Sequence, residues 1–285
     1  MRAVRGIAAA IVVPTLVLAG CTDEQASESG GGPSPTTSVQ PDESSATAST
    51  SNERSGRVAI SDGGDEVSFR CAGTGKPVIL LEAGDDSGGT QAYGPAIIDP
   101  LANQTTTCTY DRPGTGTSDE ARGRRRTLAS YRTDLSAFLH AAHLRPPYVL
   151  VGQSGGGNLL ISYAAAHVDD VAGLVLIETY HDDPDRLAKE FGPFAPTTAH
   201  GEKLDWVAIT RVLDNLALPL GDFPVLVMTA TDADPGNKKN QAYWLGISPD
   251  SRQVVITGSH DLQEDDPARV TSEIIQTLGD IRNAG

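Results

Sequence analysis

Several kinds of residue are scarce in this chain of 285 residues. Cysteine occurs three times, methionine and tryptophan twice each, and aromatic residues make up 5% of the chain. So few cysteines exclude a small scaffold held together mainly by disulfides. Basic residues are also outnumbered, with 22 Lys and Arg against 37 Asp and Glu, which gives a formal net charge of −15. Because a nucleic-acid partner would need a basic face, we expect none.

A long apolar run is missing as well. The apolar stretch from Gly6 to Leu18 follows Arg2 and Arg5, is too short to cross a membrane comfortably, and ends in small residues. Residues 1–20 are therefore predicted to be a secretory signal peptide. The segment that ends at Cys21 resembles a bacterial lipobox, in which the cysteine is lipidated and becomes the new N-terminus; the alternative is a plain signal peptide with an unrelated cysteine. A lipidated Cys21 would anchor the protein to the outer face of the cell membrane.

The next segment has very few apolar side chains that could be buried in a core. Residues 22–55 are nearly all Ser, Thr, Pro, Gly, Ala, Gln, Asp and Glu, a composition that cannot offset the entropy of ordering a chain. We therefore predict a disordered tether over 21–56, and one domain, expected to be monomeric, over 57–285.

The domain alternates short apolar runs with helical patterns. Continuous Val, Ile and Leu strands separated by helices predict an α/β fold, a mostly parallel sheet covered on both faces. Residues 181–222 are too long for a single crossover, so we expect either a small cap insertion over the site or surface helices with no gating role. The predicted strands are 67–71, 78–82, 107–110, 148–152, 173–178, 225–230 and 253–257, and the clearest helices are 128–142, 158–168 and the one that begins at Asp266-Pro267.

The most informative motif is Gly152-Gln153-Ser154-Gly155-Gly156, at the end of an apolar strand. Gly-x-Ser-x-Gly is typical of a sharp strand-to-helix turn that presents a serine nucleophile, where small residues two positions before and after let strand and helix approach. A serine nucleophile needs a base, and His260 lies downstream, directly after the last predicted strand. The spacing of His140 and His143 could suggest a metal site, but no third ligand is near them, so no metal site is predicted.

Four blocks of sequence, taken together, resemble the α/β-hydrolase fold family, in particular exported bacterial serine hydrolases. They cover nearly all of residues 65–281 and are Cys71-Ala72-Gly73-Thr74-Gly75-Lys76-Pro77 leading to Leu81-Glu82-Ala83-Gly84, Tyr110-Asp111-Arg112-Pro113-Gly114-Thr115-Gly116, the serine turn, and Gly258-Ser259-His260 ending at Pro267.

The resemblance implies that Ser154 is the nucleophile and His260 the general base. It also implies an oxyanion hole made by the backbone N–H groups of Gly155 and Asp85. Asp85-Asp86 departs from the family, which usually has apolar residues or glycine here, and two carboxylates would oppose a developing negative charge unless they point to solvent. Arg112 could be taken for a substrate-binding residue, but we expect it to stabilise its loop through internal hydrogen bonds.

The acid that orients the histidine has more than one candidate. Glu178 ends one predicted strand, while Asp232 and Asp234 follow the next strand, each about one residue out of the commonest register. We favour Glu178. Separately, Cys71 and Cys108 form an even pair in a domain predicted to be exported, and both flank predicted strands, so we expect a disulfide, with two buried free thiols as the alternative.

These residues predict an exported, membrane-tethered serine hydrolase that cleaves small-molecule esters through an acyl-enzyme and needs no metal or organic cofactor. The alternatives are a peptidase or amidase on the same triad, a cofactor-free haloperoxidase-like enzyme, and a surface lipoprotein that binds without turnover.

Overall fold

The computed structural model describes residues 52–284, apart from 86, 123–124, 193–200 and 233–234. The predicted signal peptide, Cys21 and residues 22–51 of the predicted tether lie outside the described residues. The first strand begins at Arg54 and pairs with the next strand along its whole length. Residues 54–56 therefore belong to the domain, which corrects the predicted boundary at residue 57.

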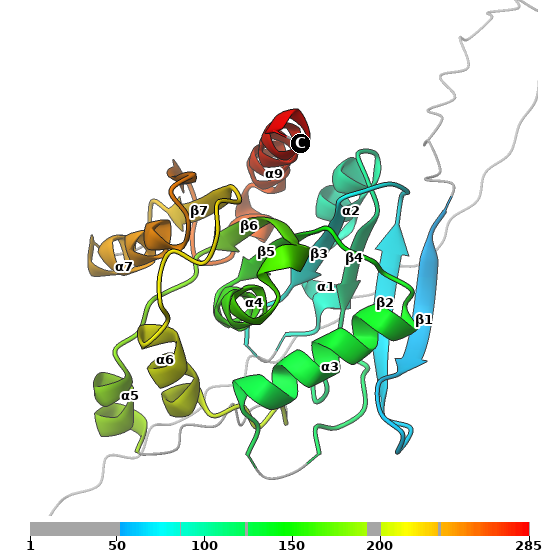
Figure 1. The fold of residues 1–285 in the computed structure, drawn as a ribbon, viewed down its shortest axis with the longest axis horizontal. Helices are drawn as coiled ribbons and strands as arrows, with labels where there is room; N and C mark the ends of the chain where they lie inside the picture. Colours follow the sequence, from blue (N-terminus) through cyan, green and yellow to red (C-terminus); the bar gives the residue numbers. More distant parts are fainter. Residues whose placement is uncertain (1–51, 86, 123–124, 193–200, 233–234, 285) are drawn as a thin grey trace, which may run out of the picture. The chain divides into compact units, whose positions relative to one another are not determined.

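In the described part of the chain, eight strands form a single sheet in the order β1-β2-β4-β3-β5-β6-β7-β8 (Figure 1). The β1–β2 and β2–β4 pairs are antiparallel and all the others are parallel. The mostly parallel sheet predicted from the sequence is thus confirmed. The strands are β1 (Arg54–Ala59), β2 (Glu66–Ala72), β3 (Val78–Glu82), β4 (Thr107–Tyr110), β5 (Tyr148–Gln153), β6 (Val171–Ile177), β7 (Val225–Ala230) and β8 (Ser251–Ile256).

Helices cover both faces of the sheet, and the central strands distribute alternate side chains between them. Leu80 of β3 and Leu150 of β5 pack in one core cluster with α3, α4 and α6, whereas Ile79 and Val149 pack in a second cluster with α2 and α9. This two-sided burial explains why the strands read as continuous apolar runs. The helices are α1 (Gly89–Ala92), α2 (Pro95–Ala102), α3 (Leu128–Ala141), α4 (Gly155–Ala166), α5 (Pro184–Phe191), α6 (Trp206–Asp214), α7 (Pro235–Gln241), α8 (Leu262–Asp265) and α9 (Pro267–Ala284), with 3₁₀ turns η1 (Val168–Asp170) and η2 (Ala242–Ile247).

The insertion between β6 and β7 is only partly separate from the core. Within the part that the structure describes it contains α5 and α6, which contact each other. Ile209 and Leu213 of α6 are buried in the same cluster as Leu160 of α4. Helix α6 therefore lies beside the helix that follows the serine turn (Figure 1), where it can contribute to a site at the carboxyl ends of the strands.

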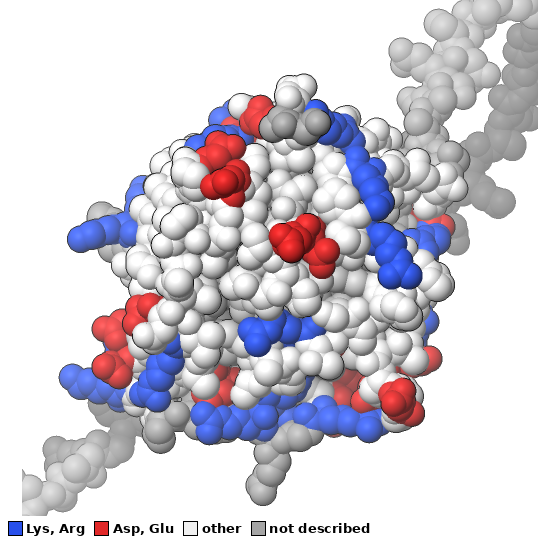
Figure 2. All heavy atoms as spheres, viewed as in Figure 1, with Lys and Arg blue, Asp and Glu red and all other residues white. Residues whose placement is uncertain are grey.

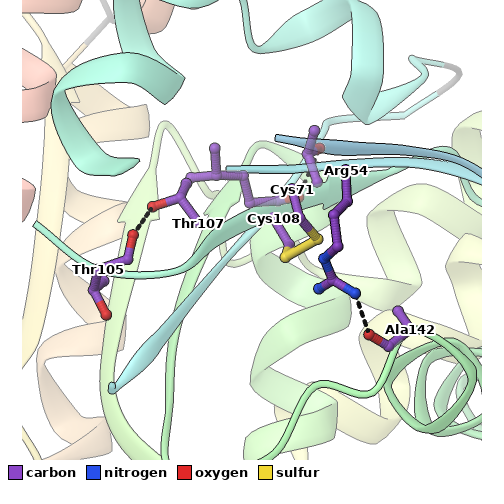
Figure 3. Close-up of a disulfide and its surroundings, with 8 residues drawn as sticks. Arg54, Cys71, Thr105, Thr107, Cys108 and Ala142 are labelled. Atoms are coloured by element: carbon purple, nitrogen blue, oxygen red, sulfur yellow. Dashed lines mark hydrogen bonds between the residues drawn. A yellow bond between two sulfur atoms is a disulfide. The ribbon is translucent and has the colours of Figure 1, made fainter. Parts of the chain in front are cut away.

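A disulfide joins Cys71 of β2 to Cys108 of β4 (Figure 3). The two residues are direct partners in the antiparallel ladder, with Cα atoms 4.1 Å apart, and both side chains are buried. The predicted pairing is confirmed. The cross-link fixes the antiparallel part of the sheet, away from the parallel strands β5 to β8.

The charged surface is mixed on the face that carries α3, α4 and α6. Figure 2 shows Lys and Arg mainly around the margin of this face, with separate acidic groups between them and uncharged residues over much of the centre. Among the described residues, no helix is both long enough and apolar enough to cross a bilayer.

Candidate functional site

Ser154 lies at the turn between β5 and α4, in a backbone conformation that is rare for a residue with a side chain. Its φ is 51° and its ψ is −128°, and its N–H donates to the carbonyl of Ile177 at 2.8 Å. The flanking glycines leave no room for larger residues. A methyl group built on Gly152 would lie 2.5 Å from the Gly157 Cα, and one on Gly156 would lie 2.2 Å from the Ala83 carbonyl oxygen. The predicted need for small residues at both positions is confirmed.

His260 follows β8 and lies against Glu178, which follows β6. The His260 Nδ1 atom is 3.4 Å from Glu178 Oε2. The carbonyl of His260 also accepts a hydrogen bond of 3.2 Å from the side chain of Gln153, the residue before Ser154. Three segments that are distant in the sequence are thus brought to one edge of the sheet. Within the described part of the chain no hydrogen bond joins the Ser154 hydroxyl to His260, whose ring is held through Nδ1.

Glu178 is fixed in place by more than its histidine. Its backbone φ is 48°, and its side chain is 1% exposed. Oε1 accepts from the Ala230 N–H at 2.6 Å and from the Gln241 side chain at 2.9 Å, which leaves Oε2 to face His260. Tyr180 also donates to Oε2, at 2.8 Å. Four neighbours therefore hold this one buried carboxylate.

The hydrogen bonds control the charge states of this pair. Burial raises the pKa of Glu178, but the bonds from His260, the Ala230 N–H, Gln241 and Tyr180 outweigh it and leave that pKa below its ordinary value. The pKa of His260 is raised, chiefly by its hydrogen bond to Glu178, against burial, which lowers it. The lowered pKa of Glu178 and the raised pKa of His260 both favour an ion pair between the two side chains. The anionic Glu178 thereby makes the imidazole of His260 more basic.

The other acid candidate that the structure describes makes different contacts. Asp232 is exposed, its carboxylate accepts from the Thr231 hydroxyl at 3.1 Å, and its N–H donates to the Gly258 carbonyl. Asp234 lies outside the described residues. Of the two described candidates, Glu178 is the one whose carboxylate meets the histidine.

Sequence reasoning missed Tyr180, which contacts both members of the pair. Its hydroxyl donates to Glu178 Oε2 at 2.8 Å, and its oxygen lies 3.2 Å from His260 Nδ1. The two rings also stack, with centroids 5.5 Å apart. The Tyr180 oxygen can accept from the Nδ1–H of His260 while its own proton goes to Glu178, so the imidazole is oriented by two oxygens. A tyrosine three residues after the end of β6 gives no sequence pattern that would reveal this.

Asp85 does not point away from the serine turn. A methyl group built on Gly155 would lie 1.9 Å from Asp85 Oδ1 and 2.9 Å from Cη2 of Trp206, the first residue of α6. The carboxylate and the indole ring therefore both lie against the residue that follows Ser154. Asp85 is also close enough to His260 to contribute to its raised pKa. Asp85 is nevertheless exposed, so it also borders solvent, and the predicted oxyanion hole depends on its backbone N–H rather than on its side chain. Asp86 lies outside the described residues.

A buried arginine holds the loop that carries Asp85. Arg112 donates to the carbonyls of Ala83 and Gly84, each at 2.7 Å, and pairs with Glu82 at 2.6 Å and with Glu202 of the insertion at 2.6 Å. All three charged side chains are fully or almost fully buried. The internal hydrogen bonds predicted for Arg112 are confirmed, and Glu202 is a partner that the sequence did not suggest.

Comparison with known proteins agrees with this architecture. A family model described as alpha/beta hydrolase fold matches residues 76–205. RutD of Caulobacter vibrioides, named provisionally as a carbamate hydrolase, is 30% identical over 165 residues, which cover 53% of this chain and 60% of that protein. The uncharacterised protein YqjL of Bacillus subtilis is 24% identical over 209 residues, covering 68% of this chain and 81% of YqjL.

Solved structures show the same arrangement of elements. A thermophilic esterase from Thermogutta terrifontis matches with a TM-score of 0.64 and 22% identity, covering 80% of this chain and 99% of the esterase chain. At that identity the likeness shows the fold alone.

Proposed function

We propose, since the chain belongs to the α/β-hydrolase fold family, that it is an exported serine hydrolase that cleaves ester bonds through Ser154, His260 and Glu178. One observation carries the proposal most directly. A buried carboxylate meets His260 Nδ1 at 3.4 Å, at the edge of the sheet where Ser154 occupies a turn with positive φ.

In the proposed reaction, the Ser154 hydroxyl oxygen attacks the ester carbonyl carbon as its proton passes to Nε2 of His260. Glu178 stays ionised, keeps the Nδ1–H oriented and stabilises the imidazolium. The oxyanion accepts hydrogen bonds from the N–H groups of Gly155 and Asp85. When the C–O bond breaks, the leaving alcohol takes the proton from His260. Water then attacks the acyl-enzyme with the same histidine as base, which releases the acid and restores Ser154.

The test is covalent labelling of the full-length protein with a fluorophosphonate probe, followed by hydrolysis of p-nitrophenyl esters of rising acyl length. We expect labelling of the wild type, none of Ser154→Ala, and loss of ester turnover in His260→Ala with the fold retained by circular dichroism. A wild-type protein that is neither labelled nor active would instead support a binding protein with this fold.

Cleavage of C–N bonds is a second candidate, because RutD is named for a carbamate. The same serine and histidine would act on a carbonyl with an amine leaving group, which His260 would have to protonate. Parallel assays with the p-nitroanilide and the p-nitrophenyl ester of one acid separate the two candidate functions. An esterase should favour the ester over the anilide by much more than their difference in intrinsic reactivity.

The proposal includes lipid anchoring at Cys21, supported by the sequence pattern around it. Full-length protein expressed in a bacterial host should be found in the membrane fraction and extract into detergent. Cys21→Ala should be recovered in the soluble fraction, whereas persistent membrane association of that variant would contradict the anchor.

A further inference from the structure

A polar cavity lies beside the proposed catalytic residues. It has a volume of about 230 Å³ and is bordered by the loop after β3, by helix α1 and by the segment that follows His260. Its described lining includes Gln153, which immediately precedes Ser154, and Asp261, which immediately follows His260. A group held in this cavity would therefore contact the chain neighbours of both the nucleophile and the base.

The side chain of Gln263 is the clearest sign that the cavity receives a ligand. Gln263 belongs to α8, lines the cavity and is 6% exposed. Its buried Oε1 atom has no hydrogen-bond partner among the described residues. Buried polar atoms are almost always paired in folded proteins, because an unpaired acceptor has lost its bonds to water without gaining others. A hydrogen-bond donor bound in the cavity would satisfy this oxygen.

The other buried amide of the lining, that of Gln153, is already fixed. Its Nε2 atom donates to the His260 carbonyl at 3.2 Å, and its Oε1 atom lies 2.3 Å from the position that a methyl group on Gly84 would occupy. Gln153 therefore joins the serine turn to the loop after β3 and to the histidine segment. A ligand would meet a wall that is already ordered, which lowers the entropic cost of binding.

The remaining lining groups indicate what kind of ligand fits. The side chains of Ser87 and Gln91 can donate and accept hydrogen bonds, whereas the carboxylates of Asp261 and Glu264 only accept. The described lining has no lysine or arginine, which a phosphate or carboxylate ligand would need, and no aromatic ring, which would favour a quaternary ammonium group. Hydroxyl groups, which both donate and accept, match this set of side chains.

The size of the cavity limits the ligand further. Its volume of about 230 Å³ is below the roughly 300–1,000 Å³ that is typical of sites for drug-sized molecules, and it suits a group the size of one sugar ring.

We propose that this cavity binds the alcohol part of the ester, and that this alcohol is rich in hydroxyl groups, as a sugar is. The inference rests on the proposed serine hydrolase function and names its substrate class. In the proposed reaction the leaving alcohol takes its proton from His260, so it departs beside the histidine, where the cavity lies. One hydroxyl of the alcohol donates to Gln263 Oε1, and others donate to the carboxylates of Asp261 and Glu264.

The test compares acetate esters on the full-length protein. Methyl 6-O-acetyl-β-D-glucopyranoside and cyclohexylmethyl acetate both join acetate through a CH₂ group to a six-membered ring, with and without hydroxyl groups. Choline acetate and 3,3-dimethylbutyl acetate supply a cation and its neutral isostere. All four esters form the same acetyl-enzyme, so their kcat/KM values compare the alcohol parts alone. Each kcat/KM is divided by the rate constant for alkaline hydrolysis of the same ester, which removes intrinsic reactivity.

We expect the sugar ester to be preferred over cyclohexylmethyl acetate by about tenfold or more, and choline acetate to show no comparable preference over its isostere. Gln263→Met keeps the length of the side chain and removes the amide, so it should reduce the sugar preference by about fivefold. Gln276→Met is the matched control, because it removes an exposed amide of α9 that is not part of the described lining. Its sugar preference should equal that of the wild type.

A second measurement needs no variant. Acetyl-enzyme formed from p-nitrophenyl acetate partitions between water and an added alcohol. An alcohol bound in the cavity attacks the acetyl carbon as its proton passes to His260, and the Ser154 oxygen leaves with that proton, so the acetate ester of the alcohol is formed. Methyl β-D-glucopyranoside should accept more acetyl groups than cyclohexylmethanol at equal concentration.

Three results would overturn the inference and leave the proposed function standing. They are equal normalised kcat/KM for the sugar ester and cyclohexylmethyl acetate, a preference confined to choline acetate, and acetyl transfer to cyclohexylmethanol at an equal or higher yield. An unchanged sugar preference in Gln263→Met, or an equal loss in Gln276→Met, would also count against the cavity. A wild-type protein with neither fluorophosphonate labelling nor turnover of any ester would overturn the inference and the proposed function together.

Discussion

The Tyr180 ring lies nearly parallel to the His260 ring, and its hydroxyl oxygen is 3.2 Å from His260 Nδ1, slightly closer than the Glu178 oxygen at 3.4 Å. Because that hydroxyl also donates to Glu178, it links the acid and the base of the proposed triad. The imidazole therefore depends on two neighbours for its orientation.

Replacing Tyr180 with phenylalanine keeps the stacked ring and removes the oxygen. We expect kcat for a p-nitrophenyl ester to fall by about tenfold, less than the 10²- to 10⁴-fold that a proton-transferring group itself contributes, because Glu178 still holds the imidazole. Tyr243→Phe is the control, because Tyr243 stacks on His181 and not on His260. Equal activity of both variants would show that the Tyr180 hydroxyl does not orient the base.

The acid assignment can be tested by Glu178→Gln and Asp232→Asn. Loss of the carboxylate should lower kcat by about 10²- to 10⁴-fold in Glu178→Gln and leave Asp232→Asn close to wild type. The wild-type kcat/KM should rise with pH through a midpoint above the ordinary histidine value of 6.5, since Glu178 raises the pKa of His260. In Glu178→Gln that midpoint should move downward. A larger loss of activity in Asp232→Asn would reverse the assignment.

The same ion pair makes a pH-dependent contribution to stability. A raised pKa for His260 stabilises the fold below the unfolded value of 6.5, and this contribution disappears as pH rises through the folded pKa. A lowered pKa for Glu178 stabilises the fold above the unfolded value of 4.5, and this is lost as pH falls through the folded pKa. The Tm difference between wild type and His260→Gln should thus be largest from about pH 4.5 to 6.5 and shrink on either side. A difference independent of pH would exclude the ion pair.

The disulfide between Cys71 and Cys108 closes a loop with a sequence separation of 37 residues. On the chain-entropy account its removal costs about 4 kcal/mol, which lowers Tm by about 10 °C in a domain of this size. The measurement is thermal unfolding of the wild type and of Cys71→Ala/Cys108→Ala, with and without reductant. Reductant should act on the wild type alone. Identical melting of all four samples would show that no bridge forms.

Arg112 should be much more important for stability than an exposed arginine. Arg112→Met leaves Glu82 and Glu202 buried without their cation, at a cost of about 3–5 kcal/mol in urea unfolding. Arg122→Met removes an ion pair with Asp65 from a side chain that is 64% exposed, at a cost below about 1 kcal/mol. Similar losses in the two variants would mean that the buried network is not what stabilises this region.

The sequence predicted the fully buried strands well because all of their residues lie in the protein interior. Val78–Glu82 and Val225–Ala230 are buried along their whole length, so an apolar run marks both the strand and its bounds. Strand β1 has the opposite character. Its residues are mostly exposed and polar because it lies at the sheet edge, and its start at Arg54 has the composition of the preceding segment. Hydrophobic pattern therefore could not separate it from the tether.

The site was predictable only where a local motif specifies the geometry. Ser154 and His260 belong to short patterns whose turns define them, and the end of a strand makes Glu178 a candidate. Trp206 and Glu202 reach the site from the insertion through packing. Contacts of that kind depend on the register of distant helices, and no spacing in the chain encodes them.

The backbone conformation at Ser154 serves the proposed catalysis at a cost in stability. A residue with a side chain at φ 51° costs about 1–3 kcal/mol, and glycine at the same position would relieve most of that cost. Ser154→Gly should therefore melt higher than the wild type while losing its nucleophile. Selection for thermal stability alone would therefore favour inactive variants. A useful selection must require turnover as well as stability.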